Sequence, residues 1–393
     1  MTKKERIIVF LLAALNFTHI LDFMIMMPLG NYLMPFFKIS PQQFSFLVAS
    51  YTLSASASGF MAAFFVDGFD RKKILIFAYG GFLAATFACG FAPSYHFLLI
   101  ARIIAGVFGG MIGAQVISII ADLFVYERRG RAMGAVMSSF AVASTVGIPL
   151  ALYLANLISW HAPFIFIASL GVLLIPMLIY FLPAMNMHLK TSGKARFNTE
   201  GFVAVFKDDA QYKALIFSGM MMFAHFIIVP FINPYMEFNL GYSKHLTPLI
   251  YLVGGIAAFI SANFLGRLSD KIGKLKIFTI CLLLSLPMMW LVTNLITIPY
   301  WIVLVLFGLW FTVSTGRGVT AQAMVSNVVK PEYRGSFQSF NSSMQQLGSG
   351  LASLTAGFIV TKNADASIAH YHWLGYIGIA AMMITLFIAR KIF

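Results

Sequence analysis

The sequence predicts an all-α integral membrane protein with twelve transmembrane helices in two pseudo-symmetric six-helix halves. Three observations lead to this fold class. The chain is 60% hydrophobic with a mean hydropathy of +0.86, which is more apolar surface than a soluble domain buries. Its apolar residues form continuous runs rather than the alternating pattern of a β-barrel. The second half of the chain also repeats the first.

The apolar runs divide the chain into two halves and a linker. A span needs about 20 apolar residues, so we expect a six-helix half at 1–182, a polar, basic cytoplasmic linker at 183–211 and a second six-helix half at 212–393. The first run follows a basic start, as in a signal peptide, but it is long and has no small-residue cleavage site close behind it. The expected spans are roughly 7–30, 42–65, 74–92, 97–121, 132–156, 162–182, 212–235, 246–266, 275–296, 299–324, 336–360 and 371–390.

The net charge of +14 is explained by the orientation of these spans. If the N-terminus is cytoplasmic and the spans alternate, only Lys38, Lys244 and Lys362 fall in outer loops. This positive-inside pattern predicts a bacterial-type inner (plasma) membrane protein with both termini in the cytoplasm. The basic residues are scattered over short loops, which argues against nucleic acid as a partner.

The chain shows no pattern typical of an enzyme or of a cofactor or metal site. Cys89 and Cys281 lie within expected spans of different halves, without metal-ligand spacing or an expected disulfide. There is no phosphate-binding P-loop and no nucleophile elbow. An ion gradient is therefore the expected source of energy.

An internal repeat relates the two halves. The sequence "FTH" at 17–19 recurs as "FAH" at 223–225, and "GAQ" at 113–115 recurs as "TAQ" at 320–322. Pro28 matches Pro234, and Asp67 matches Asp270. These offsets are nearly equal, which indicates duplication of one six-helix unit.

Two charged loops carry a family resemblance. "FFVDGFDRKK" at 64–73 has a looser copy, "LGRLSDKIGK", at 265–274, and "ARIIAGVFGG" at 101–110 is a further motif. These motifs resemble those of the major facilitator superfamily over the whole chain, although Ala63 and Asp70 stand where that family usually has glycine. The first helix, "THILDFMIMMPLGNYL", is similar to the twelve-helix drug:proton antiporter branch. Gly147 and Pro149 match its helix-five antiporter motif only weakly.

The charged loops are expected to form a cytoplasmic gate. An Asp in such a loop can cap a neighbouring helix N-terminus, and the basic residues can pair with acids at the end of helix four. Such a cluster would latch the two halves in the outward-facing state; the alternative is that the basic residues only set topology. The expected gate residues are Asp67, Arg71, Lys72, Asp122, Glu127, Arg129, Asp270 and Arg334.

Charged or histidine side chains within spans are candidates for function because burying them is costly. They are His19, Asp22, Arg102, His225 and Arg317, on helices one, four, seven and ten. The family resemblance implies that these four helices line the central cavity. Asp22 is the expected proton carrier, with His19 on the same helical face and Arg102 as its partner. The alternatives are a static ion pair and structural histidines.

The substrate cavity is expected to be amphipathic. Its candidate residues are Asn16, Tyr51, His225, Tyr251 and Arg317. Arg317 has no counterpart in the first half, where Gly110 takes its place, and so suggests an anionic or carbonyl-rich group on the substrate. Abundant Phe, Met and Tyr residues suit apolar ligands.

The predicted function is proton-coupled efflux of amphipathic small molecules or drugs by alternating access. The expected partners are a small-molecule substrate, protons and the lipid bilayer, and the protein is expected to be a monomer without a cofactor. One alternative is an exporter of an anionic metabolite or siderophore. Alternatives of another class are a membrane receptor or sensor that does not transport its ligand, and a lipid-modifying enzyme.

Overall fold

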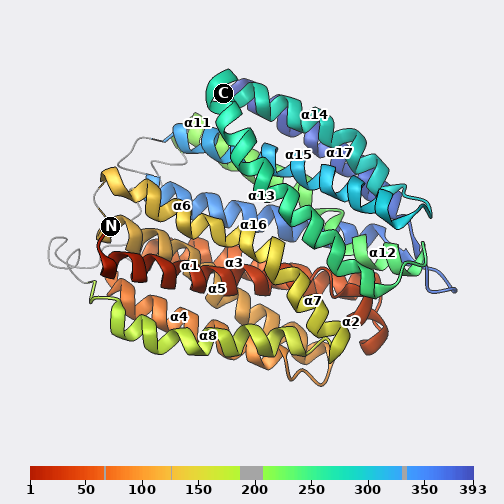
Figure 1. Cartoon of the computed structure of the whole chain (residues 1–393), viewed down its shortest axis with the longest axis horizontal. Helices are drawn as coiled ribbons and strands as arrows, with labels where there is room; N and C mark the ends of the chain where they lie inside the picture. The colour runs from red at the N-terminus through yellow and green to blue at the C-terminus, as the bar shows by residue number, and fades with distance from the viewer. Residues whose placement is uncertain (66–67, 125, 186–206, 330–333) are drawn as a thin grey trace.

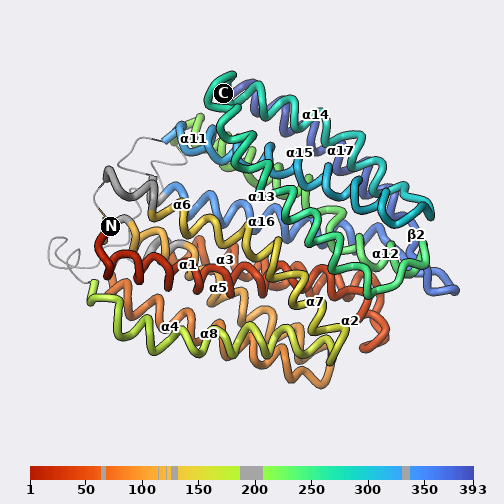
Figure 2. Tube along the Cα trace, viewed as in Figure 1, coloured from red at the N-terminus to blue at the C-terminus, as the bar shows by residue number. Residues whose placement is uncertain are grey.

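A computed structural model describes residues 1–65, 68–124, 126–185, 207–329 and 334–393 (Figure 2). Side chains at 63–65, 114, 121, 126–131 and 334–336 are not described. The predicted gate residues Asp67, Glu127, Arg129 and Arg334 are therefore outside the residues whose side chains can be placed.

The first half is helical throughout its described residues, and its first span is longer than predicted. Pro28 follows the end of the first helix, and its missing N–H and its ring interrupt the helical ladder. The chain then resumes as a second short helix that reaches Phe37 rather than residue 30. The elements are α1 (Lys3–Ile25), α2 (Gly30–Phe37), α3 (Pro41–Phe65), α4 (Arg71–Cys89), α5 (Tyr95–Leu123), α6 (Tyr126–Val142), the π-helix η2 (Ala143–Gly147), α7 (Ile148–Leu157) and α8 (Ala162–Phe181).

The second half repeats this arrangement, including the interruption of its first span near Pro230. A short antiparallel hairpin, β1–β2, was not predicted; it pairs Thr361 with Ala369 between the last two helices. The elements are α11 (Asp209–Phe226), η3 (Val229–Phe231), α12 (Ile232–Phe238), η4 (Lys244–Leu246), α13 (Thr247–Ile272), α14 (Lys274–Thr293), α15 (Tyr300–Asn327), α16 (Arg334–Ile359), β1 (Thr361–Lys362), β2 (Ile368–Ala369) and α17 (Tyr371–Ile392).

The two halves form two layers of roughly aligned helices (Figure 1). The chain termini, the α3–α4 connection and the α13–α14 connection lie at one end, which we call the termini end. The α2–α3, α12–α13 and α16–α17 connections lie at the other, which we call the distal end. The layers meet along α3 and α16, with further contacts between α2 and α12 and between α13 and the η2–α7 segment.

Within the described residues, ten segments are long and apolar enough to cross a membrane. The long helices α3 and α16 are not among them; both contain several Ser and Gln residues. Ser56 Oγ of α3 donates a hydrogen bond to the Ser343 carbonyl of α16 over 2.9 Å. Small residues let the two backbones approach closely along this contact, while Met61 of α3 and Leu351 and Phe358 of α16 are exposed on their outer faces. The all-α membrane fold is confirmed, and twelve spans remain a prediction.

Contacts between the halves close the distal end. The Asn31 side-chain amide of α2 donates to the Glu237 carboxylate of α12. The Asn233 amide of α12 donates to the Pro28 carbonyl over 3.0 Å. Gly30 allows this approach, since a Cβ there would lie 3.0 Å from Pro234. We call Asn31, Glu237, Asn233 and Pro28 the distal seal.

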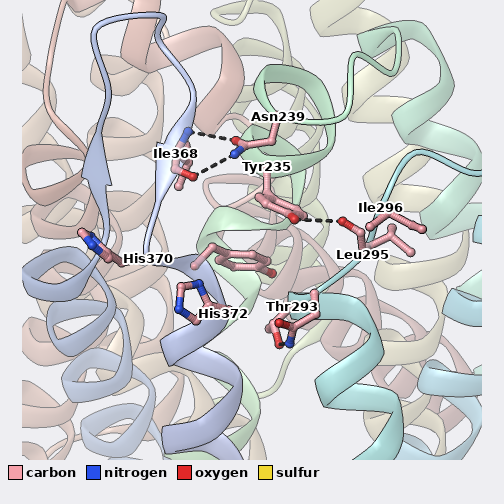
Figure 3. A pocket seen from close by; sticks show the side chains of 10 residues that line it. Tyr235, Asn239, Thr293, Leu295, Ile296, Ile368, His370 and His372 are labelled. Atoms are coloured by element: carbon pink, nitrogen blue, oxygen red, sulfur yellow. Dashed lines mark hydrogen bonds between the residues drawn. The ribbon is translucent and has the colours of Figure 1, made fainter.

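A cavity of about 290 Å³ lies beside this seal, within the second half (Figure 3). Two polar side chains at its wall hold neighbouring loops. The Tyr235 hydroxyl donates to the Leu295 carbonyl over 2.9 Å, and the Asn239 side chain both donates to and accepts from the Ile368 backbone. These groups therefore brace the β1–β2 hairpin and the α14–α15 connection.

Candidate functional site

A buried ion pair lies inside the first half, towards the distal ends of α1 and α5. Arg102 Nη1 of α5 is 2.8 Å from Asp22 Oδ2 of α1, and both residues are fully buried. Such a pair is costly to desolvate, and removing either partner would leave an unpaired charge in the interior. The structure thus brings together the two residues expected to carry the proton chemistry.

Tyr51 and His19 complete this N-half cluster. The Arg102 guanidinium lies 4.4 Å above the centre of the Tyr51 ring, a cation–π contact. The His19 ring contacts Phe82 edge-on at 5.5 Å and lies 6.4 Å from the Tyr51 ring. Tyr51, expected in the substrate cavity, therefore belongs to the ion-pair cluster.

The glycine motif of α5 creates the space for this cluster. A Cβ on Gly109 would lie 2.6 Å from the Tyr51 hydroxyl and 3.0 Å from His19 Nε2. A Cβ on Gly106 would lie 2.3 Å from the Tyr51 carbonyl. These glycines let α3 and α1 press their polar side chains against α5.

The N-half cluster has unused hydrogen-bonding capacity. Asp22 Oδ1, Arg102 Nε, the Tyr51 hydroxyl and both ring nitrogens of His19 are buried without a hydrogen-bond partner among the described residues. Buried polar groups are normally satisfied. Asp22 Oδ1 and a ring nitrogen of His19 can accept a proton, whereas Arg102 Nε–H can only donate to a water molecule or to a polar group of a ligand.

Asn16 lies on the predicted helical face but serves another contact. Its side-chain amide donates to the Val136 carbonyl of α6 over 3.3 Å. Asn16 thus ties the first span to the fifth instead of facing the ion pair.

A second cluster in the other half surrounds Arg317 of α15. Arg317 is 2% exposed, and its guanidinium contacts Met382 Sδ at 3.1 Å and His225 Nδ1 at 3.4 Å. The His225 ring stacks on Trp310 with centroids 5.3 Å apart. No Asp or Glu side chain in the described parts of the chain forms an ion pair with Arg317. This C-half cluster therefore carries a buried positive charge without a described counter-ion.

Sequence analysis missed two polar members of the C-half cluster. Trp310 Nε1 and Ser314 Oγ are buried and lack a hydrogen-bond partner within the described residues. The signal that was available is their spacing, because positions 310, 314 and 317 share one face of a helix.

Two phenylalanines join the clusters across the halves. Phe23 stacks on Tyr51 at 5.9 Å and contacts Phe226 of α11 edge-on at 5.7 Å. Phe226 in turn lies next to His225, with ring centroids 5.0 Å apart. An aromatic path therefore runs from Arg102 to Arg317. Sequence analysis missed both phenylalanines, although they directly follow Asp22 and His225.

Tyr251, the remaining candidate for the cavity, belongs to the distal seal. Its hydroxyl donates to Asn233 Oδ1 at 3.5 Å, and Asn233 donates to the Pro28 carbonyl. Tyr251 also contacts the Phe311 ring at 6.3 Å, and Phe311 in turn contacts Trp310 at 5.3 Å, so Tyr251 lies between the distal seal and the C-half cluster.

The weak helix-five motif lies against the first helix and the other half. Gly147 ends η2, and Pro149 lies in the first turn of α7. A Cβ on Gly147 would lie 2.9 Å from Leu21, beside Asp22. Within η2, Thr145 lies against Gly255 of α13. Single-turn π-helices often occur at functional sites, and this one lies where the ion-pair helix meets the opposite half.

The described gate residues make contacts within the first half. Arg71 Nε of α4 is 3.2 Å from Asp122 Oδ2 of α5. Lys72 Nζ donates to the Ile179 and Leu182 carbonyls at the end of α8, over 2.7 and 2.6 Å. The predicted pairing of a loop cation with Asp122 is present. A latch between the halves stays a prediction, and Asp270 is exposed.

The helix cap at this gate comes from Asp70, one of the two departures from the family motif. Asp70 precedes α4, and its carboxylate accepts from the Lys72 and Lys73 backbone amides over 2.9 and 3.4 Å. It also accepts from the Met185 amide over 3.3 Å. Asp70 thus fixes the α3–α4 loop and the chain after α8 to one helix N-terminus.

Comparison with known proteins places this architecture in a family. The family model described as Major Facilitator Superfamily matches residues 12–353 and 214–393. The MFS-type transporter YbcL of Bacillus subtilis is 26% identical over 316 residues, 80% of this chain and 78% of that protein. Multidrug resistance protein 3 of Bacillus subtilis is 31% identical over 131 residues, 33% of this chain and 26% of that protein.

Solved structures share the fold over the full chain. A bacterial homolog of the human lysosomal transporter Spinster, inward-facing and occupied, aligns with a TM-score of 0.72 at 14% identity, covering 100% of this chain and 96% of that chain. A D-xylose–proton symporter aligns with a TM-score of 0.73 at 16% identity, covering 97% of this chain and 96% of that chain. Sequence motifs, family match and fold agree: the chain belongs to the major facilitator superfamily and is a membrane transporter rather than an enzyme.

Proposed function

We propose that the protein is a proton-coupled exporter of amphipathic small molecules, with Asp22 as the proton-binding group. The observation that carries this proposal is the fully buried Asp22–Arg102 pair with an unpartnered Asp22 Oδ1. A carboxylate in an apolar interior must either pair with a cation or take up a proton. Asp22 can do both, so it can exchange Arg102 for a proton during the transport cycle.

The proposed coupling runs through Phe23 rather than through rigid rocking alone. Asp22 and Arg102 lie in the same half, so a rigid rotation of one half against the other would not separate them. Phe23, however, stacks on Tyr51 within the half and contacts Phe226 across the interface. When the halves move, loss of the Phe226 contact would release Phe23 and Tyr51, and thereby alter the packing around Arg102.

The charge distribution and the distal seal together support an inward-facing state, in which the substrate site opens to the cytoplasm. Lys and Arg residues concentrate in the loops at the termini end, which is typical of a cytoplasmic face. With both termini in the cytoplasm of a bacterial-type inner membrane, a closed distal end corresponds to an inward-facing state. The inward-facing, occupied structure of the bacterial Spinster homolog shares this fold. We propose a monomer as the transporting unit, because each half contributes one cluster.

An amphipathic substrate is supported by the aromatic side chains between the two clusters and by one relative. Phe23, Phe226 and Trp310 offer apolar and aromatic surface between two arginines. The similarity to multidrug resistance protein 3, which extends over a third of this chain, also supports an amphipathic substrate.

A second candidate function is export of an anionic metabolite or siderophore. Arg317 favours it, because a buried cation without a described acidic partner would be stabilised by a carboxylate from the substrate. The free Nε1–H of Trp310 and the Ser314 hydroxyl can donate to the same group. A non-transporting receptor would use these clusters for binding alone.

The test is transport in proteoliposomes with an imposed pH gradient. A substrate screen on the unaltered protein is followed by Asp22→Asn, which mimics the protonated carboxylate and cannot titrate. We expect Asp22→Asn to abolish uphill transport while passive exchange of the same substrate continues. Uphill transport by Asp22→Asn under a pH gradient alone would move the coupling role to His19 or His225. Substrate binding without any flux in the unaltered protein would favour the receptor.

A further inference from the structure

A second, larger cavity lies at the termini end of the second half, away from both clusters. Its volume is about 820 Å³. It lies between the first turns of α14, the last turn of α15 and the last turn of α17, and Figure 1 shows these helix ends beside the C-terminus. The described residues that line it are Gly273, Lys274, Leu275, Lys276, Thr279, Ile280, Met324, Asn327, Arg390 and Phe393.

The cavity carries an excess of positive charge. Lys274, Lys276 and Arg390 line it, and no Asp or Glu side chain does so among the described residues. None of the three cations forms an ion pair within the described parts of the chain.

Helix dipoles account for only one of these cations. Arg390 lies in the last turn of α17, where a cation is favourable. Lys274 and Lys276 lie in the first turn of α14, where the helix presents its own positive end. Gly273 precedes them with φ 103° and provides no side-chain cap. The first backbone N–H groups of α14 therefore have no capping acceptor and can donate to a ligand. An anion between α14 and α17 would satisfy these amides and both lysines.

Part of the cavity wall is apolar. Leu275, Ile280, Met324 and Phe393 form this wall, and Ile280 lies about 9 Å further along α14 than Lys274 at 1.5 Å per residue. α14, α15 and α17 are all long and apolar enough to cross a membrane. The cavity therefore presents cations at the helix ends and hydrocarbon surface deeper along the spans.

We propose that this cavity binds an anionic phospholipid, with its phosphate held by Lys274, Lys276 and Arg390 and an acyl chain along Ile280 and Met324. A free phosphate compound shares the chemistry of the headgroup. The apolar wall favours the lipid, because a free anion would occupy only the cation-lined part of the cavity, whereas an acyl chain would also fill the apolar part.

The test uses the full chain purified in detergent and stripped of lipid. Phosphatidylglycerol, phosphatidylcholine and inorganic phosphate are added separately, and bound lipid is counted by native mass spectrometry beside thermal stability. The variant Lys274→Gln/Lys276→Gln/Arg390→Gln removes the cations. Its matched control, Lys4→Gln/Lys271→Gln/Lys391→Gln, removes three exposed cations that do not line the cavity. Ile280→Trp fills the apolar wall and leaves every cation in place.

We expect phosphatidylglycerol to bind and stabilise the unaltered protein and the control variant more than phosphatidylcholine does. The cation-deleted variant should bind phosphatidylglycerol at least about tenfold more weakly, and Ile280→Trp should also weaken it. An equal loss of phosphatidylglycerol binding in the control variant would show that the effect depends only on the net charge of the protein, and would overturn the site. Binding of inorganic phosphate without preference for phosphatidylglycerol, or lipid binding unaffected by Ile280→Trp, would also overturn the lipid assignment.

Discussion

Phe23 of α1 contacts Phe226 of α11 edge-to-face, with ring centroids 5.7 Å apart. This contact joins the two halves between the buried ion pair and the C-half cluster. Aromatic pairs contribute about 0.5–1.5 kcal/mol beyond the burial of their area. That is enough to bias a conformational equilibrium without locking it.

The Phe23–Phe226 contact is expected to couple the halves. Phe226→Leu keeps an apolar side chain and removes the ring. It should reduce uphill transport under a pH gradient by about tenfold if the pair contributes up to 1.5 kcal/mol, while passive exchange stays closer to normal. The control is Phe358→Leu, because Phe358 makes another ring contact between the halves, with Phe46 at 6.2 Å, far along the chain from either arginine. Equal effects of the two variants would contradict a special role for Phe226.

The Asp22–Arg102 pair is expected to behave as a buried pair. Arg102→Gln leaves a carboxylate without its partner and should destabilise the protein by about 3–5 kcal/mol. Adding Asp22→Asn should recover much of that loss, because the double variant carries neither charge. Thermal unfolding in detergent measures both effects. A double variant no more stable than Arg102→Gln alone would show that the loss comes from packing around Arg102.

Gly109 is expected to be essential for the N-half cluster. Gly109→Ala places a methyl group 2.6 Å from the Tyr51 hydroxyl and 3.0 Å from His19 Nε2. Tyr51 must then shift, and its contact with Arg102 should be lost together with most proton-driven transport. Gly113→Ala is the matched control on the same helix, since nothing lies within 4 Å of its added Cβ. Full activity of Gly109→Ala would exclude a tight fit between Tyr51 and α5.

Arg317 is expected to select substrates by charge. Arg317→Gln should weaken binding of anionic or carbonyl-bearing substrates by about tenfold or more, the usual effect of losing a charge-assisted hydrogen bond, and should affect cationic substrates less. Arg317→Lys keeps the charge and should show a smaller effect. Binding is measured by isothermal titration on purified protein. Equal losses for both charge classes would assign Arg317 a packing role.

The distal seal is expected to set the population of the closed distal end. Glu237→Ala removes the acceptor for the Asn31 amide, a bond to a charged group typically worth about 1.5–3 kcal/mol. Spin labels on His96→Cys and Ile296→Cys, exposed positions near the distal connections of opposite halves, report the separation of the halves by double electron–electron resonance. The distance distribution should shift towards longer values in Glu237→Ala and less in Glu237→Gln. An unchanged distribution in Glu237→Ala would mean that the remaining contacts, such as Asn233 to Pro28, hold the seal alone.

The sequence by itself determined the membrane fold, the two-fold repeat and the identity of the buried charges. Hydrophobic runs show where lipid is the solvent, and a charge within such a run must have a partner or a purpose. The pairing of Asp22 with Arg102 and of Arg71 with an acid at the end of helix four could be anticipated on these grounds.

Only the tertiary structure decided which partners meet. Asn16 was on the expected helical face, yet it bonds to α6, because periodicity gives the direction of a side chain but not its neighbour. Tyr51 and Tyr251 look alike in sequence, yet one faces Arg102 and the other faces the distal seal. Phe23, Phe226, Trp310 and Ser314 are ordinary residues of apolar helices. Phe23 and Phe226 gain a role from a contact between segments 203 residues apart, and Trp310 gains one from its contact with His225 of another helix. Such contacts depend on how whole helices pack rather than on any local pattern.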